Sequence, residues 1–127
     1  MTEKKLPSSW DLQSEKLYAN CRIFEVRERR FKRRSDGLEG DFYVLDTNDW
    51  VNVLAITPEQ KIVLVRQFRF GSRENSLEPP GGVVEKGEDP IIAGIRELEE
   101  ETGYVGQKPE LIGSVRPNAA ILSNRCH

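Results

Sequence analysis

Apolar and polar residues follow strand-like patterns over several short stretches of the chain. β-branched residues recur in 50–57 (WVNVLAIT) and in 61–70 (KIVLVRQFRF), and this composition favours strands. The stretch from Leu17 to Leu45 predicts a β-hairpin whose turn is Ser35–Gly37, because glycine tolerates the positive φ that such turns need. Residues 110–115 (ELIGSV) predict a further strand. Several short strands are therefore expected along the chain.

One stretch has the spacing of a helix. It begins at Asp89-Pro90, where Asp can cap free N–H groups and Pro fits the first turn, and it ends at Gly103. At ~100° per residue, one face of this helix carries three carboxylates: Glu97, Glu100 and Glu101. Another face carries the apolar residues Ile91, Ile95 and Leu98. The pattern predicts an apolar side for the core and a separate acidic side, with Glu99 exposed to solvent.

The same patterns divide the chain into three parts. Residues 1–13 are polar, contain Pro and Ser, and are expected to be flexible. Residues 14–47 form an N-terminal β-region that contains the predicted hairpin. Residues 48–127 hold the remaining strands and the helix. At 127 residues the chain is long enough for one domain with one hydrophobic core.

Charge narrows the classes of partner. The net charge is −2, so no overall field favours nucleic acid or a membrane. The basic run Arg27–Arg34 has a single aromatic residue among its charges, and we interpret it as the solvated face of a strand. The opening MTEKKLPSSW resembles no signal peptide and no apolar run could span a bilayer, so we expect a cytoplasmic protein.

Cysteine and histidine are too few for several kinds of chemistry. Cys21 and Cys126 lack metal-type spacing, and they are expected to be free thiols. The one histidine is His127, at the last position, which disfavours a catalytic triad or a histidine-rich metal site.

The acidic helix face needs a positive partner. Like charges this close on one helix repel one another, and ligands that are all oxygen suit hard cations such as Mg²⁺ or Mn²⁺. The preceding Gly81-Gly82 turn lets the backbone come close to such a site, because glycine has no Cβ. Arg96 adds a fixed cation beside the acids. Such a charge run alone is usually a solvated surface, so the wider pattern decides its meaning.

That wider pattern is a fixed spacing. Gly82 is followed by five residues and Glu88, then by seven residues and the run 96–104 (RELEEETGY). This resembles the Nudix box, G-x5-E-x7-R-E-U-x-E-E-x-G-U with U apolar, and every fixed position matches. A pattern of this length with fixed spacing is far more specific than a lone glycine motif.

The resemblance implies an α/β fold, a Nudix α/β/α sandwich around a mixed sheet, with the N-terminal β-hairpin added to it. It also implies hydrolysis of a nucleoside diphosphate linked to another moiety. In this reading the metal ligands are Glu97, Glu100, Glu101 and the carbonyl of Gly81. Arg96 and Glu88 would form an orienting ion pair, and Gly82 would shape the loop beside the substrate.

The segment VRQFRFGSRENSLEPPGG is similar to the matching part of ADP-ribose pyrophosphatases and nucleotide-sugar hydrolases. The resemblance implies substrate contacts for Arg69, Arg66 and Glu78, and we expect the two arginines to share one strand face. The N-terminal hairpin resembles the region through which those enzymes form swapped homodimers, where the partner helps to hold the base. Trp50 could stack on a base, but packing is the favoured interpretation.

The chain departs from the family pattern after the box. Only residues 105–127 follow Tyr104, whereas the family continues through more strands and a final helix. The C-terminal part is expected to be short or truncated, and either a compact variant or completion by a partner would also account for it. No acidic residue follows Glu110, although relatives position a water with a later glutamate, so metal binding is better supported than turnover.

Three functions remain open on the sequence. The first is a Mg²⁺-dependent pyrophosphatase that acts on ADP-ribose or a nucleotide sugar. The second is a Nudix hydrolase of nucleoside triphosphates, dinucleotide polyphosphates or RNA caps. The third is a nucleotide-binding module that does not hydrolyse its ligand.

Overall fold

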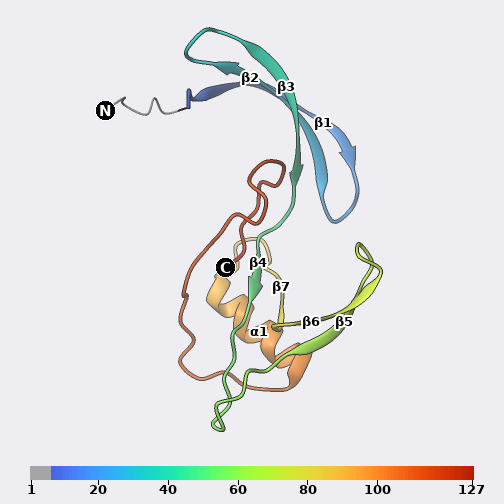
Figure 1. Ribbon diagram of the computed structural model, residues 1–127, viewed down its shortest axis with the longest axis vertical. Helices are drawn as coiled ribbons and strands as arrows, with labels where there is room; N and C mark the ends of the chain where they lie inside the picture. The colour runs from blue at the N-terminus through green and yellow to red at the C-terminus, as the bar shows by residue number, and fades with distance from the viewer. Residues whose placement is uncertain (1–6) are drawn as a thin grey trace, which may run out of the picture. The chain divides into compact units, whose positions relative to one another are not determined.

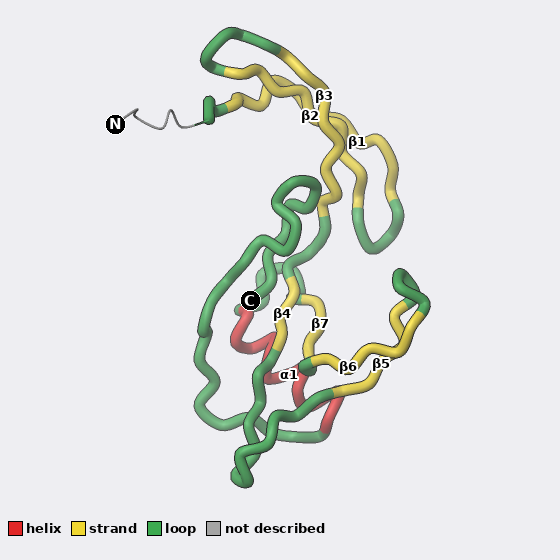
Figure 2. Tube along the Cα trace, in the orientation of Figure 1, coloured by secondary structure: helices red, strands yellow, loops and turns green. Residues whose placement is uncertain are grey.

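The computed structural model describes residues 7–127, and its chain forms two compact units (Figures 1 and 2). The first unit contains the described residues up to Thr47 together with Asn118–Ser123. The second unit contains Asn48–Pro117 and Asn124–His127. The first boundary between the two units falls between Thr47 and Asn48.

The first unit is an antiparallel sheet in the order β1-β2-β3. Its strands are β1 (Trp10–Asn20), β2 (Glu25–Arg33) and β3 (Glu39–Asp46). The predicted hairpin is therefore wrong in its first arm, which folds back on itself before Glu25. The reason is a local turn: the Asn20 side chain accepts a hydrogen bond of 3.0 Å from the N–H of Arg22, which has a φ of 66°.

The start of β1 corrects a second expectation. The flexible segment was expected to run to residue 13, yet Trp10 already pairs with Arg33 of β2. The indole also packs edge-on against Phe42, and Arg33 lies over its ring. Residues 1–6 of that segment lie outside the described part of the chain.

The basic run lies on β2 and is matched by acidic side chains. Arg29 contacts Asp46 at 2.8 Å, and Arg30 contacts Asp41 at 3.1 Å. Arg33 contacts Asp36, on the turn before β3. The first two ion pairs join β2 to β3 and the third joins β2 to the turn, all at a partly solvated surface, which agrees with the interpretation as a strand face.

The second unit combines two small sheets with a helix. Strand β4 (Trp50–Asn52) pairs with β7 (Gly81–Val83), and β5 (Val65–Arg69) forms a hairpin with β6 (Glu74–Glu78). Helix α1 (Pro90–Thr102) packs against β7 and β4. This mixture of strands and a helix confirms the predicted α/β class. The described residues contain this one helix, so the second helical layer of a sandwich stays a prediction.

The strands of the second unit are shorter than their sequence pattern predicts. Of 50–57 only the first three residues lie in β4, because β7, its partner, is itself three residues long. Further along, Ile56 and Ile62 meet at an isolated bridge. The expected strand at 110–115 is wrong except at Val115, which bridges to Cys126. Cys126 also forms a parallel bridge with Trp50, so β4 has neighbours of both directions.

Helix α1 begins and ends where the sequence predicts. The side chain of Asp89 accepts a hydrogen bond of 2.8 Å from the N–H of Ile91, and Pro90 is the first helical residue. Gly103 follows the helix with a φ of 73°, and its N–H donates to the carbonyl of Glu99. The caps fix the helix register and so fix the direction of its acidic side chains.

The buried core of the second unit is small and lies under the helix. Val51, Val84 and Ala93 form one buried cluster, and Leu98 is also buried. Cys21 and Cys126 are free, as expected. None of the helical residues in the described range forms a stretch that is both long and apolar enough to cross a bilayer.

Candidate functional site

The acidic residue Glu97 lies on the covered side of helix α1. It is one turn from Ala93, which is fully buried, and its own side chain is only 14% exposed. An ideal Cβ on Gly82 would lie 2.3 Å from the Glu97 carboxylate carbon. The prediction of separate apolar and acidic sides is therefore wrong for this residue, because the missing side chain of Gly82 makes room for a carboxylate beside β7.

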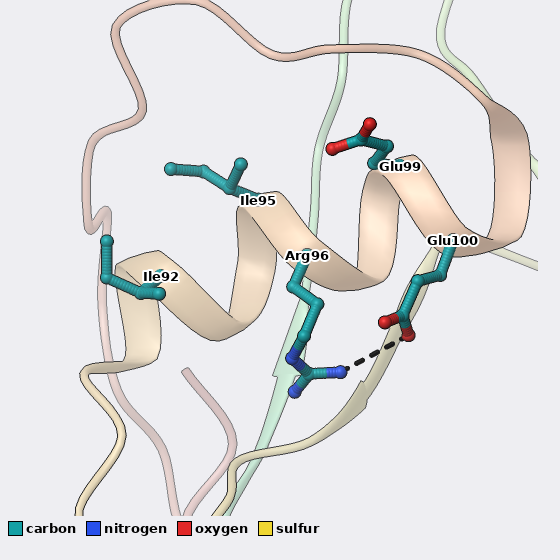
Figure 3. A pocket seen from close by; sticks show the side chains of 5 residues that line it. All are labelled: Ile92, Ile95, Arg96, Glu99 and Glu100. Carbon is teal, nitrogen blue, oxygen red and sulfur yellow. Dashed lines mark hydrogen bonds and ion pairs between the residues drawn. The ribbon is translucent and has the colours of Figure 1, made fainter.

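Arg96 holds two of the predicted acids together. Its Nη1 donates to Glu97 Oε1 at 2.7 Å and to Glu100 Oε2 at 3.3 Å. Figure 3 shows Arg96 and Glu100 pointing to the same side of the helix, while Ile95 and Glu99 point away from them. The guanidinium of Arg96 is therefore a positive charge that lies between the carboxylates of Glu97 and Glu100.

Arg96 is itself held by Glu88 in the loop before the helix. Its Nε and Nη2 each donate to one oxygen of Glu88 at 3.0 Å, and Nη2 also reaches the carbonyl of Val83. The Glu85 N–H donates to Glu88 as well. The hydrogen bond from Arg96 holds the pKa of Glu88 below its ordinary value, and the Glu88 carboxylate raises the pKa of Arg96. Both groups stay charged, and the pair fixes the guanidinium under the acids.

Glu101 is anchored at the glycine turn. Its Oε2 accepts a hydrogen bond of 3.1 Å from the N–H of Gly81, and its Oε1 accepts one of 3.0 Å from Gln67. The predicted role of the Gly81 carbonyl as a metal ligand stays a prediction. The turn nevertheless contacts two acids, Glu97 through Gly82 and Glu101 through Gly81.

Gln67 is the site residue that the sequence interpretation missed. It lies on β5 two residues before Arg69, and in a strand residues at that spacing share a face. Strand alternation could have placed it beside Arg69. The same rule corrects the expectation for Arg66, because β5 pairs with β6 without a bulge and residues three apart point to opposite faces. Within residues 7–127 the exposed Arg66 side chain forms no hydrogen bond or ion pair.

Arg69 and Glu78 form an ion pair between β5 and β6. The Arg69 Nε lies 3.0 Å from both Glu78 oxygens, and Nη2 donates to Oε2. The hydrogen bond from Arg69, aided by Ser76, lowers the pKa of Glu78 to about 2. The charge of Glu101 also helps to raise the pKa of Arg69, after Glu78. Arg69 therefore stands within electrostatic reach of the acidic cluster.

Glu99 has the separate position that the helical pattern predicts. It is exposed and, with Ile92 and Ile95, lines a shallow hollow on the outer side of helix α1 that Arg96 and Glu100 border (Figure 3). Within the described part of the chain, the Glu99 carboxylate forms no hydrogen bond with another side chain. Glu99 is thus a suitable reference residue for charge changes on the same helix.

The arrangement can be tested for its fit to a divalent cation. In the described part of the chain, no three His, Cys, Asp or Glu side chains converge on one metal position, because Glu101 turns to Gly81. Mg²⁺ in phosphate sites commonly uses one or two carboxylates and completes its shell with water and substrate phosphates. Glu97 and Glu100 each give one oxygen to Arg96 Nη1, so their second oxygens could supply such a pair, and the space at Gly82 admits Glu97. The donor set fits a hard cation.

Comparison with known proteins adds a family match. A family model described as "NUDIX domain" matches residues 47–123. A "Methanol dehydrogenase activator" of Bacillus methanolicus is 52% identical over 77 residues, which cover 61% of this chain and 42% of that protein. An "ADP-ribose pyrophosphatase" of Bacillus subtilis (strain 168) is 52% identical over 58 residues, covering 46% of this chain and 31% of that protein.

Two further matches agree with these. An "ADP-sugar pyrophosphatase" of Mus musculus is 51% identical over 66 residues, covering 52% of this chain and 30% of that protein. A solved structure titled "Crystal structure of ADP compounds hydrolase" superposes with a TM-score of 0.83 at 21% identity, over 96% of this chain and 66% of that one. The structural match shows the fold. The chain spans less than half the length of these three curated relatives.

Proposed function

Because the chain belongs to the NUDIX domain family, we propose that it hydrolyses the pyrophosphate bond of a nucleoside diphosphate linked to another moiety. The substrates we favour are ADP-ribose and related nucleotide sugars. The observation that carries the proposal is the seating of Glu97 over Gly82, with Arg96 joining it to Glu100. Relatives named ADP-ribose pyrophosphatase and ADP-sugar pyrophosphatase support the choice of substrate class.

Nudix hydrolases generally use divalent metal ions. For this chain we propose Mg²⁺, or Mn²⁺ in its place, held by Glu97 and Glu100, with Glu101 and the Gly81 carbonyl as further ligands. When bound, such a cation neutralises negative charge that develops on the phosphoryl group. Glu101 would have to exchange its contact with the Gly81 N–H for this role.

The chain's own residues have distinct parts in the proposed reaction. Glu88 holds Arg96, and Arg96 sets the positions of Glu97 and Glu100. Arg69, charged and half-exposed beside Glu78, is placed to contact substrate phosphate oxygens. Water would attack one phosphorus and the bridging P–O bond would break. The products would be a nucleoside monophosphate and a sugar phosphate, with release of a proton.

We also propose a cytoplasmic homodimer assembled through the N-terminal β-region. The proposal rests on the resemblance of that region to the N-terminal hairpin of ADP-ribose pyrophosphatases. Size-exclusion chromatography with light scattering tests it directly. A dimer that persists in high salt is the expected result, and a monomer at micromolar concentration would contradict it.

A substrate panel tests the catalytic proposal. Purified protein with Mg²⁺ is incubated with ADP-ribose, nucleotide sugars, dinucleotide polyphosphates, capped RNA and nucleoside triphosphates, and products are separated by chromatography. We expect AMP from ADP-ribose, and loss of this product in the double variant Glu100→Gln/Glu101→Gln. Turnover confined to the triphosphates, dinucleotide polyphosphates or capped RNA would replace the proposal with the second kind of Nudix hydrolase. Tight nucleotide binding without hydrolysis would favour a binding module.

A further inference from the structure

A second hollow in the same unit lies beside the acidic cluster. Its volume is about 440 Å³, and it is lined by Trp50, Asn52, Arg69, Glu78 and Pro79. This volume lies within the range of roughly 300–1,000 Å³ that is usual for small-molecule sites. None of the metal ligands proposed above lines this hollow. It would therefore hold a part of the substrate other than the metal-bound phosphates.

Strand β4 directs two of the lining side chains into the hollow. Trp50 and Asn52 are two residues apart and share a face of the strand. Val51, between them, points the other way and is buried with Ala93 of the helix. The helix therefore occupies one face of β4, while the other face presents an indole ring and an amide to the hollow.

Gly81 lies between a lining residue of the hollow and the acidic cluster. An ideal Cβ on this residue would lie 3.0 Å from Asn52 Oδ1, so the amide lies directly over the turn. On the same residue, the N–H donates to Glu101. Arg69, which lines the hollow, also interacts electrostatically with Glu101. A ligand whose pyrophosphate lies at the acids can thus extend one end into the hollow.

The lining suits a nucleoside better than a second phosphorylated group. An indole ring offers a stacking surface that any nucleobase can use. The Asn52 Nδ2 donates to Cys126 Sγ at 3.7 Å, and the second N–H of the amide can still donate to a base edge. Glu78 and Arg69 both line the hollow and form an ion pair with each other, so the described lining offers no unpaired cation for a second phosphate.

We propose that the hollow of Trp50 and Asn52 binds the nucleoside end of the substrate, with the base stacked on Trp50. Asn52 then hydrogen-bonds the base edge, and Arg69 marks the passage to the phosphates. The proposal rests on the proposed function for the position of the pyrophosphate. It goes beyond that function by placing the base within the chain's own second unit.

Tryptophan fluorescence gives a direct test, because the chain has two tryptophans. In the variant Trp10→Phe the remaining emission comes from Trp50. This protein is titrated with AMP and with ribose 5-phosphate in the presence of Mg²⁺. We expect AMP to quench the emission saturably and ribose 5-phosphate to leave it unchanged, since only AMP carries a base.

Binding affinities provide the second readout, measured by calorimetry. Trp50→Ala is expected to raise the Kd for AMP by about tenfold, the usual loss when one base-stacking aromatic residue is removed. Its Kd for ribose 5-phosphate should stay within about twofold. Trp10→Phe removes the other indole, in the first unit, and serves as the matched control. If Trp50→Ala does not fold, Trp50→Phe keeps a ring and should retain most of the affinity.

Three results would overturn the proposal: no saturable binding of AMP, equal losses for AMP and ribose 5-phosphate in Trp50→Ala, or a loss with Trp10→Phe in place of Trp50→Ala. Hydrolysis of ADP-ribose is followed on the same preparations. Hydrolysis of ADP-ribose without base-dependent binding would contradict only the proposal that the hollow binds the nucleoside. Base-dependent binding without hydrolysis contradicts only the proposed function.

Discussion

At the scale of single residues, the site depends on two neighbouring glycines that lack a side chain for different reasons. A Cβ on Gly82 would meet the carboxylate of Glu97, which is the end of a flexible side chain. A Cβ on Gly81 would lie 2.1 Å from the carbonyl oxygen of Val51, which belongs to the backbone of β4. The first contact can be relieved by rotating a side chain, but the second cannot. The two positions should therefore respond differently to the same change.

Replacement of Gly82 by alanine should affect the site more than the fold. The added methyl displaces the Glu97 carboxylate, so we expect the Kd for Mn²⁺ to rise by roughly 10–100-fold, the range seen when metal-site supports are removed. The midpoint of thermal unfolding should change little. Calorimetric titration of Mn²⁺ measures the first quantity. Gly113→Ala is the matched control, because its Cβ would meet no atom within 4 Å; equal Mn²⁺ binding in both variants would contradict the assignment.

Replacement of Gly81 by alanine should affect the fold itself. The clash lies between β7 and the backbone of β4, so the pair must separate, and overpacking of this kind costs about 1–3 kcal/mol. Urea unfolding followed by far-UV circular dichroism measures the loss. A Gly81→Ala protein as stable as Gly113→Ala would show that the two strands approach less closely than described.

At the scale of elements, helix α1 carries the acids, and its first turn depends on Asp89. The variant Asp89→Ala loses the hydrogen bond to the N–H of Ile91 and should be less stable by about 1 kcal/mol. Asp89→Asn keeps a capping oxygen and is expected to restore most of that stability. Denaturant unfolding of the wild type, Asp89→Ala and Asp89→Asn measures these differences in stability. Equal stability of the alanine and asparagine variants would mean that the cap does not hold the helix.

The hairpin of β5 and β6 should show an acid-dependent stability. Glu78 has a pKa of about 2 beside Arg69, below its ordinary value of 4.5. Because the pKa of Glu78 is lower in the folded protein, the ion pair stabilises the fold at pH values above the ordinary pKa of 4.5. This stabilisation is lost as the pH falls from 4.5 through about 2. The wild type should therefore exceed Glu78→Gln in thermal midpoint at pH 6, and the difference should shrink between pH 4.5 and 2. A constant difference across this range would exclude the ion pair as its cause.

At the scale of the whole molecule, the candidate site could be predicted from residues close together in sequence. The strand lengths could not, because they depend on pairing with strands far along the chain. The Nudix spacing and the helix caps depend on near neighbours in sequence, so Glu88, Arg96 and both helix ends could be located. The length of β4 depends on β7, about thirty residues later in the chain, and no local pattern carries that information. The β-branched composition alone extended the predicted strand to residue 57.

Close contacts between the helix and the strands could not be predicted from the sequence either. The helical pattern alone could not show that Gly82 admits Glu97 beneath the helix, because the pattern contains no information on the opposing strand. The contact of Gln67 with Glu101 joins residues far apart in sequence. Even so, alternation along β5 would have placed Gln67 on the face of Arg69. Tertiary contact, more than propensity, therefore accounts for what the sequence interpretation missed.

The central claim is that Glu97 and its neighbours hold a divalent cation that promotes pyrophosphate hydrolysis. The most direct test is the initial rate of AMP release from ADP-ribose, measured across a Mg²⁺ titration for wild type, Glu97→Gln and Glu99→Gln. Glu99→Gln makes the same change at an exposed position of the same helix. We expect saturable Mg²⁺ dependence for wild type and Glu99→Gln, and a maximal rate lowered by roughly 100-fold or more in Glu97→Gln. AMP release that persists without divalent metal, or that is equal in Glu97→Gln and wild type, would contradict the account.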